Sequence, residues 1–483
     1  MARDGILGLL EEIFREVVVD TLSAVIFFDA AFWTDAAEVP LVVLWLVVAA
    51  FFFTLRFQFV NLRAFRHGVD CVRGRYTRDE EGGEISHFQA LSAALSATVG
   101  LGNIAGVAFA VAIGGPGAVF WMVLGGFLGM SSKFAECTLG QKYRVIREDG
   151  HVSGGPMHYL RDGLGELGWV RLGRMLAGIF AVMCIGGSIG GGNMYQSNQA
   201  YSQVASVFPV FSGMTGNLVF GVGLAALVGV VIVGGIRRIG EVAATLVPLM
   251  CVVYVSAGLC ILLMHAGSLL SGLGTIVGAA FSLEAGFGGL VGVLIQGFRR
   301  AAFSNEAGCG SAAIVHSAAR TDEPVREGVV ALLEPFIDTV IVCTMTGLVL
   351  VVTGAHAAPD AGEGIQMTSW AFASVFPWFP YVLSFTAVLF AFSTMISWSY
   401  YGEQCWARLF GVRSILLFKG IFLVFAVLGT LFEATAVVDF GDMMILGMAF
   451  PNLVGVFLLS SVVKRDLDGY LARLKSGEIR PVR

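Results

Sequence analysis

The chain has 483 residues, of which 56% are hydrophobic and only 13% are charged. Soluble domains carry about 25% charged residues, so this composition excludes an ordinary globular protein, and the apolar content excludes a disordered one. The 63 glycines are roughly twice the usual share and are typical of membrane helices that approach one another closely. The basic residues form no stripe of the kind that binds nucleic acid. The composition therefore predicts an all-α protein with several membrane spans.

Apolar runs long enough to cross a bilayer predict about eleven spans. A spanning helix needs about 20 mostly apolar residues. The runs that meet this length lie near 40–60, 88–112, 117–141, 174–208, 216–236, 240–266, 270–302 (with a break), 327–354, 380–406, 415–432 and 440–463. Residues 1–39 scatter acidic residues among apolar ones, which predicts an amphipathic segment rather than a cleavable signal peptide. Residues 40–463 are then the membrane domain, and residues 464–483 are a tail.

The distribution of basic residues predicts the orientation, because Lys and Arg accumulate in short cytoplasmic loops. With eleven spans, every Lys and Arg except Arg3 and Arg15 falls in alternate connections or in the tail, and Arg299 and Arg300 are part of this set. The opposite connections are uncharged or acidic, as at Glu363 and Asp439. We therefore expect residues 1–39 outside the cytoplasm and the C-terminal tail inside it.

The centre of the second span favours unwinding. Gly100, Gly102 and Asn103 lie within an apolar run, where unpaired backbone groups are tolerated only beside a cavity. In transporters such a break supplies carbonyl ligands for a cation and helix ends for a charged substrate. The glycines could instead form a close-packing face. The G-x-G-x-x-A pattern from Gly100 to Ala105 is not a dinucleotide site, because it does not follow a strand of a β-α-β unit.

A counterpart to this break is expected in the seventh span, at the glycine-rich stretch Phe281–Gly289. Interrupted helices at corresponding places in two halves of a chain indicate a transport site. Five spans fall within 88–266 and five within 270–463, and an odd number of spans in each half requires the halves to be inverted. The sequence thus predicts a 5+5 inverted-repeat bundle preceded by one additional span.

Polar clusters in two other spans could complete such a site. Asn193 and Gln196 are three residues apart in the fourth span, where carboxamides must face the bundle interior or water. Gln196 could bind a substrate or form an interhelical hydrogen bond. In the ninth span, Ser393 and Thr394 offer hydroxyl oxygens that suit a hard cation such as sodium. Each hydroxyl could instead bond to a carbonyl of its own helix.

Acidic residues in or near the spans are candidates for gating or coupling. Glu136 lies three residues after a lysine, and Asp338 lies four residues after Glu334. Glu306 lies in the segment 304–311, which combines helix-capping residues with two glycines and could be a gate hinge or merely a turn. Structural pairing of these acids is equally consistent with the sequence.

These segments resemble the alanine or glycine:cation symporter family, also called sodium:alanine symporters. The matching stretches are Ser96–Val107, Gly114–Gly117, Gly154–Met157, Gly192–Met194 with Gln196 and Asn198, Phe303–Ser311, Ser393–Thr394 and Trp398–Glu403. The resemblance implies a LeuT-like fold that works by alternating access. It also implies sodium-coupled uptake of a small neutral amino acid, alanine or glycine, across the cytoplasmic (inner) membrane of a bacterium or archaeon.

The resemblance also implies roles for individual residues. The substrate site would be formed by Thr98, Gly100, Gly102, Asn103, Gln196 and Trp398. The sodium ion, as the coupling ion, would be bound by Gly100, Ser393 and Thr394. Three positions depart from the family pattern: Leu101 where threonine is usual, Tyr195 in place of a smaller residue, and Ala301 in place of glycine.

Other functions remain open at this point. One alternative is a proton-coupled or exchange-type amino-acid transporter of the same fold, with an acid such as Glu136 or Asp338 titrating. A channel and a membrane-embedded hydrolase are further alternatives. The seven histidines lie near span ends or in loops, which disfavours a hydrolase, so we expect no enzymatic activity. The expected partners are the amino acid, sodium and the bilayer, without nucleic acid or an obligate protein partner.

Overall fold

The computed structural model describes residues 14–482 apart from 33–37, 79, 149 and 283–285. Most of this part is helical, and its one sheet is the antiparallel hairpin of β1 (Val145–Ile146) and β2 (Val152–Ser153), in which Val145 lies opposite Ser153. Within the described residues, eight helices are long and apolar enough to cross a membrane, or nine when one bent pair counts as a single span. The prediction of an all-α membrane protein with many spans is confirmed, while the number eleven stays a prediction.

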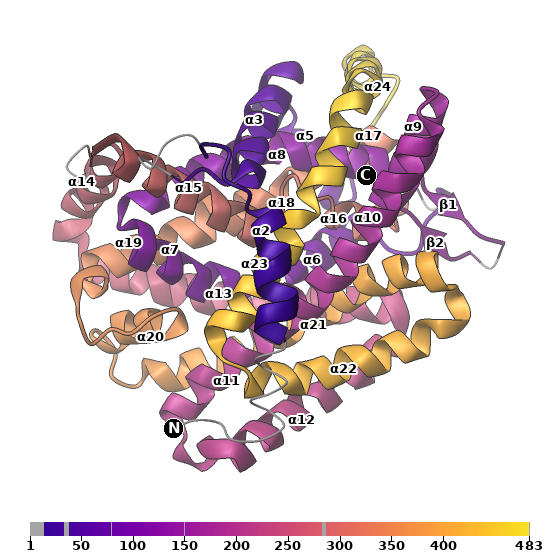
Figure 1. The fold of residues 1–483 in the computed structure, drawn as a ribbon. Helices are drawn as coiled ribbons and strands as arrows, with labels where there is room; N and C mark the ends of the chain where they lie inside the picture. The colour runs from indigo at the N-terminus through magenta and orange to yellow at the C-terminus, as the bar shows by residue number, and fades with distance from the viewer. Residues whose placement is uncertain (1–13, 33–37, 79, 149, 283–285, 483) are drawn as a thin grey trace.

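The N-terminal part packs against later helices. Its helices are η1 (Phe14–Asp20), α2 (Thr21–Ile26), α3 (Leu41–Arg56), α4 (Val60–Arg63) and α5 (Phe65–Val72). Helix α3 contacts α8 (Gly117–Lys142) and lies beside α24 (Ala449–Ser476), as Figure 1 shows. Helices η1 and α2 contact α23 (Ala434–Gly447). Additional contacts with the C-terminal helices therefore fix the place of this segment.

The next section of the chain contains the predicted break. Its remaining elements are α6 (His87–Thr98), η2 (Gly102–Gly106), α7 (Val107–Gly114), α9 (Pro156–Glu166), α10 (Val170–Ile189), η3 (Gly190–Met194), α11 (Tyr195–Val207), η4 (Pro209–Phe211), α12 (Gly213–Ile232) and α13 (Gly235–Met264). The axes of 87–98 and 102–114 differ by 51°. The break in the second span is thereby confirmed.

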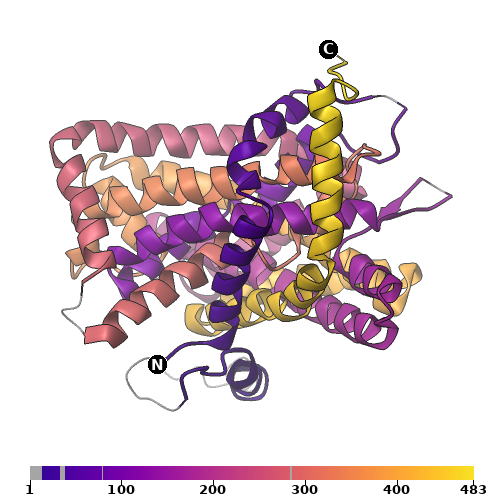
Figure 2. The same ribbon diagram turned by 90° about the horizontal axis from the view of Figure 1, so that it is seen from above.

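The last section begins with short helices and ends with long ones. It comprises η5 (Ala266–Ser268), α14 (Leu269–Ala280), α15 (Gly286–Asn305), α16 (Ala312–His316), α17 (Pro324–Ala331), α18 (Leu333–Pro335), η6 (Phe336–Cys343), α19 (Thr344–Val352), η7 (Ala355–Ala357), α20 (Ile365–Ala373), α21 (Phe379–Phe410), η8 (Val412–Ser414), α22 (Ile415–Leu431), α23 and α24. Helix α24 runs to the edge of the molecule where the described chain ends (Figure 2). The predicted tail from residue 464 is thus helical as far as Ser476.

The second half of the chain contains two interruptions near the seventh predicted span. Helix α14 ends at Ala280 and α15 begins at Gly286, and residues 283–285 between them lie outside the described part. Helix α15 ends at Asn305, and a buried irregular segment, 306–311, which we call the second break, connects it to α16. This segment has positive φ at Glu306 (55°), Gly308 (93°) and Gly310 (86°), a conformation that only glycine adopts without strain. The break that the sequence predicts within 281–289 therefore coincides with the end of α14 and the start of α15, and its role as the counterpart of the first break stays a prediction.

Close packing of α8 against the segment after the second break depends on a glycine. A Cβ atom added at Gly140 would lie 2.7 Å from the carbonyl oxygen of Ala313, which is backbone and cannot turn away. Gly178, in the middle of α10, has nothing within 4 Å of an added Cβ. The two glycines therefore differ in their surroundings although both are helical.

We expect Gly140→Ala to lower the free energy of unfolding by about 1–3 kcal/mol, because overpacking forces α8 and α16 apart. Gly178→Ala should be neutral or stabilising by up to about 1 kcal/mol, since alanine restricts the unfolded chain. Thermal unfolding of the purified protein in detergent measures both. Equal effects of the two substitutions would contradict the packing argument.

Candidate functional site

The unwound backbone of the second span is held by two carboxamides. The Gly100 N–H donates to Asn103 Oδ1 at 2.9 Å, and the Leu101 N–H donates to Gln196 Oε1 at 3.2 Å. Gln196 Nε2 donates to the Gly191 carbonyl at 3.0 Å, which orients the amide with its oxygen toward the break. The structure thus brings Gly100, Asn103 and Gln196 together.

Oxygen atoms of α6 and α21 converge beside the same break. Ser96 Oγ donates to the Ser393 carbonyl at 2.6 Å, and Thr394 Oγ1 donates to the Ser96 carbonyl at 3.0 Å. The Ser393 hydroxyl bonds to the Phe390 carbonyl of its own helix at 3.0 Å. A Cβ atom added at Gly100 would collide with Thr394 Oγ1. The cluster of hydroxyl and carbonyl oxygens therefore adjoins Gly100, and Ser393 contributes its carbonyl side rather than a free hydroxyl.

Aromatic rings close the space around the break. Trp398 is 1% exposed and lies against Gly187 and Gly192, where an added Cβ would meet its ring. The rings of Tyr195 and Phe303 meet edge to face with centroids 5.3 Å apart. These contacts leave no room for large groups between Trp398, the glycines of η3 and Phe303.

Asn103 also connects the first break to a buried carboxylate. Its Nδ2 donates to Asp338 Oδ1 at 2.6 Å, while the hydroxyls of Ser304 and Thr339 donate to Asp338 Oδ2 at 2.8 and 2.7 Å. Asp338 is 0% exposed, and no basic side chain of the described chain pairs with it. A carboxylate buried among neutral donors is costly unless a cation or a proton joins it. Asp338 is thus a candidate cation or proton site.

Four other predicted residues make contacts away from the centre of the break. The Thr98 hydroxyl bonds to the Ala94 carbonyl of its own helix at 3.2 Å. Glu136 accepts from Asn452 Nδ2 at 2.7 Å, and Glu306 accepts from the Ser311 hydroxyl. Gly102 lies at the start of η2, and an added Cβ there would be 3.7 Å from Phe303. Gly102 therefore belongs with the aromatic wall, whereas the Thr98 hydroxyl, Glu136 and Glu306 make local or interhelical bonds.

A buried ion pair covers one end of the site. Asp442 accepts from Arg300 and lies 2.8 Å from Arg299 Nη2; Arg300 and Asp442 are 3% and 0% exposed. The Arg300 guanidinium lies 5.4 Å from the centroid of the Phe303 ring. We call Arg299, Arg300 and Asp442 the lid. Asp442 is not among the residues predicted from the sequence, although a single aspartate in the apolar run after Phe440 was an available signal.

The lid corrects the predicted placement of two arginines. A cavity of about 350 Å³ at the α7 end of the second span is lined by Arg299 and Arg300 together with Glu363 and Asp439. The sequence placed these arginines on the opposite side of the membrane from Glu363 and Asp439. That placement is wrong, because Arg299 and Arg300 are part of the helix α15 and pair with Asp442, so a rule for charges in loops does not apply to them.

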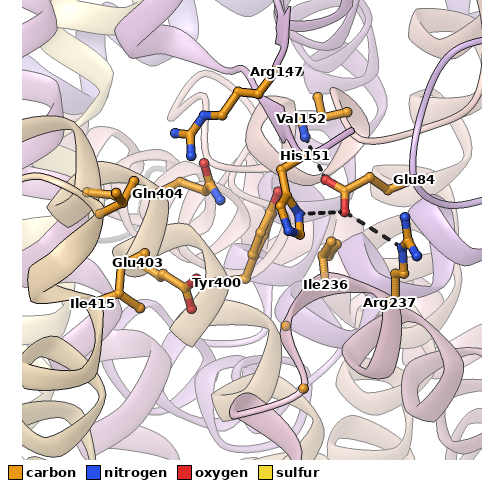
Figure 3. A pocket seen from close by; sticks show the side chains of 14 residues that line it. Glu84, Arg147, His151, Val152, Ile236, Arg237, Tyr400, Glu403, Gln404 and Ile415 are labelled. Carbon is orange, nitrogen blue, oxygen red and sulfur yellow. Dashed lines mark hydrogen bonds and ion pairs between the residues drawn. The ribbon is translucent and has the colours of Figure 1, made fainter. Parts of the chain in front are cut away.

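A second cavity, of about 440 Å³, lies at the α6 end of the second span (Figure 3). Its lining includes Tyr400 of α21, seven residues after Ser393, and Glu84 just before α6. Glu84 accepts from the Val152 N–H at 2.7 Å and lies 3.2 Å from His151 Nδ1. The candidate site therefore lies between two cavities, on what we call the Asp442 side and the Glu84 side.

This arrangement defines a class of protein. Broken membrane helices with a polar centre between two opposite cavities are typical of secondary transporters. The solved structure of MhsT in complex with L-phenylalanine supports the fold: it superposes with a TM-score of 0.53 over 79% of this chain and 99% of that chain, at 16% identity. The chain is a multi-pass membrane protein with a LeuT-like fold.

Sequence comparison identifies the family. The family model described as "Sodium:alanine symporter family" matches residues 21–483, so the chain belongs to that family. It is 41% identical over 434 residues to the sodium/alanine symporter AgcS of Methanococcus maripaludis, covering 89% of this chain and 94% of that protein. It is 33% identical over 442 residues to GlnT of Bacillus subtilis, described as a probable sodium/glutamine symporter, covering 91% and 89%. The protein is a cation-coupled amino-acid symporter.

We expect Asp442→Asn to destabilise the protein by about 3–5 kcal/mol, because it leaves two neighbouring arginines without their carboxylate. Asp439→Asn is the control: Asp439 is in the same helix and lines the same cavity, and its change should cost less than about 1 kcal/mol. Chemical unfolding in detergent measures both. If Asp442→Asn lowered the free energy of unfolding as little as Asp439→Asn does, the ion pairs of the lid would not stabilise the folded protein.

Proposed function

We propose that this protein imports a small neutral amino acid, alanine or glycine, together with sodium by alternating access. It would act in the cytoplasmic membrane of a bacterium or archaeon, with residues 1–39 outside and the C-terminal tail inside. The observation that carries the proposal is the break at Gly100–Leu101, where backbone groups, Gln196 and the oxygens of Ser96 and Thr394 meet within one buried region.

The substrate would bind at this break. Its carboxylate would meet the N-terminal end of a half-helix, where backbone N–H groups and the helix dipole favour negative charge. Its ammonium group would meet freed carbonyls and the Gln196 oxygen, which already accepts from the Leu101 N–H. Trp398 and Phe303 would limit the side chain to a small one, because they pack directly on Gly192 and beside Gly102. The carboxamide and the rings thus give both charge and size selectivity.

Sodium would bind beside the substrate, between α6 and α21. The Ser96 carbonyl, the Thr394 hydroxyl and carbonyls near Gly100 are neutral oxygen donors, which suit a hard monovalent cation. Bound sodium would stabilise the unwound backbone and so raise the affinity for the amino acid, and the amino acid would raise that for sodium equally. This reciprocity is the physical basis of the proposed symport.

The function is tested by uptake of radiolabelled alanine into proteoliposomes with and without a sodium gradient. We expect sodium-dependent uptake that falls more than about tenfold in Gly100→Ala, because the added methyl group collides with Thr394 Oγ1 and Gln196. Gly106→Ala is the matched control: it lies in the same segment, and its added Cβ would be 4.0 Å from Tyr195 Oη. Equal uptake without sodium would refute the coupling, and equal loss in both variants would refute the site.

A proton-coupled mechanism is the second candidate, and Asp338 distinguishes the two. If Asp338 helps to bind sodium, Asp338→Asn should raise the sodium concentration for half-maximal uptake by about tenfold or more, since a buried negative charge is lost. If Asp338 carries a coupled proton, the variant should keep its sodium dependence and lose its pH dependence. Asp360→Asn, in the exposed loop before α20, should behave like the wild type in both measurements.

A further inference from the structure

A cluster of buried ionisable side chains lies outside the proposed substrate and sodium sites. His87 and His316 contact the two carboxylate oxygens of Glu327 through their Nδ1 atoms, and the distance for His316 is 2.5 Å. His316 Nε2 lies 3.7 Å from Glu334, which pairs with Lys133 at 3.1 Å. All five side chains are 0–1% exposed. So many ionisable groups at such depth are rare in proteins unless they are paired.

The charges of this cluster indicate one bound proton. Glu327 and Glu334 carry two negative charges and Lys133 carries one positive charge, so with both histidines neutral the cluster has one excess negative charge. One proton on His316 removes this excess. His316 points Nδ1 at Glu327 and Nε2 toward Glu334, so a proton on this ring is stabilised by two carboxylates. In a low dielectric, a buried cluster is most stable when its net charge is zero.

Nearby charged groups do not replace that proton. Arg144 directs its hydrogen bonds to backbone carbonyls, including those of Gly82 (2.8 Å) and Ala319 (2.6 Å), and Arg326 pairs with Glu81 at 2.8 Å. The titratable and charged groups around Glu327 and His316 include two members of the cluster, Lys133 of α8 and Glu334 of α18. The others are Cys71 of α5, Glu136 and Cys137 of α8, Arg144, Glu306 of the second break, Arg326 of α17 and Tyr401 of α21. None of these makes a closer ion pair with Glu327 than the two histidines do.

The position of the two histidines gives the proton a structural role. His87 begins α6, the half-helix before the first break, and His316 ends α16, the half-helix after the second break. The segments beside them are joined by backbone bonds: the Glu84 N–H donates to the Ala318 carbonyl at 2.9 Å, and the Arg320 N–H to the Ile85 carbonyl at 2.8 Å. Glu327, from α17, bridges the two half-helices on the Glu84 side.

We propose that His316, Glu327 and Glu334 form a proton-binding site, in which one proton on His316 holds the half-helices α6 and α16 together on the Glu84 side, where His87 contacts the same Glu327. Losing the proton leaves Glu327 and Glu334 opposed by a single lysine, and this loosens the contact between the half-helices. Because the bound proton stabilises the closed arrangement, stability is present at low pH and is lost as the pH rises. The ligand is a proton, so the site does not depend on which amino acid or cation is transported.

The test is thermal unfolding of the purified full-length protein, without sodium or amino acid, between about pH 6 and pH 9. We expect the wild-type unfolding temperature to fall by about 5 °C or more over this range. His316→Gln should unfold at a lower temperature at pH 6 and change by less than about 2 °C, because the amide cannot take up the proton. His158→Gln is the control, since His158 is also buried and bonds to Ser153 at 2.9 Å; it should keep the wild-type slope.

Glu327→Gln provides a second variant if His316→Gln does not fold. It removes the carboxylate that stabilises the proton on His316, so it should also remove most of the pH dependence. A wild-type unfolding temperature that does not change with pH, or equal slopes in the wild type and the two glutamine variants, would overturn the proposal. Because no transport is measured, these outcomes are independent of sodium-coupled uptake. Where uptake is observed, its pH profile should flatten in the same two variants and not in His158→Gln.

Discussion

Unwound backbone at the centre of a membrane helix must find hydrogen-bond partners inside the protein, because lipid supplies none. In this protein that requirement arises at Gly100 and Leu101, whose N–H groups are met by Asn103 and Gln196. The rest of the arrangement follows from it. Gln196 fixes α11 beside the break, and Asn103 extends the network to Asp338. The groups that satisfy the backbone are thus the groups that we propose recognise the substrate and the cation.

Glycine makes this network possible by permitting close approach. Thr394 and Gln196 reach Gly100 because it has no Cβ atom, and the Trp398 ring lies on Gly192 for the same reason. A methyl group at either position would push apart helices that are distant in sequence. The same close packing that holds the oxygens near the break also removes the space that a large substrate would need. Packing and selectivity are therefore two results of one constraint.

Buried charge is arranged differently at the two ends of the candidate site. On the Asp442 side, one aspartate pairs with two arginines, of which Arg300 lies over the Phe303 ring. On the Glu84 side, two histidines share Glu327, and Glu334 pairs with Lys133. Breaking either group exposes an uncompensated charge to a low dielectric, which is costly. A transporter that opens one side at a time needs such costs on both sides, so that neither side opens by itself.

The sequence by itself determined the membrane class, the break in the second span, the family resemblance and most of the residues around Gly100. These are local properties, since apolar runs, glycine clusters and short motifs are read from neighbouring residues. Only the tertiary structure decided that the second buried break lies at 306–311, that Arg300 faces Asp442, and that His87 meets Glu327. Asn103 and Asp338, like His87 and Glu327, are more than 200 residues apart, and nothing in either segment specifies its partner. Their pairing depends on how the helices pack, because a buried charge or amide takes its partner from whatever the fold places beside it.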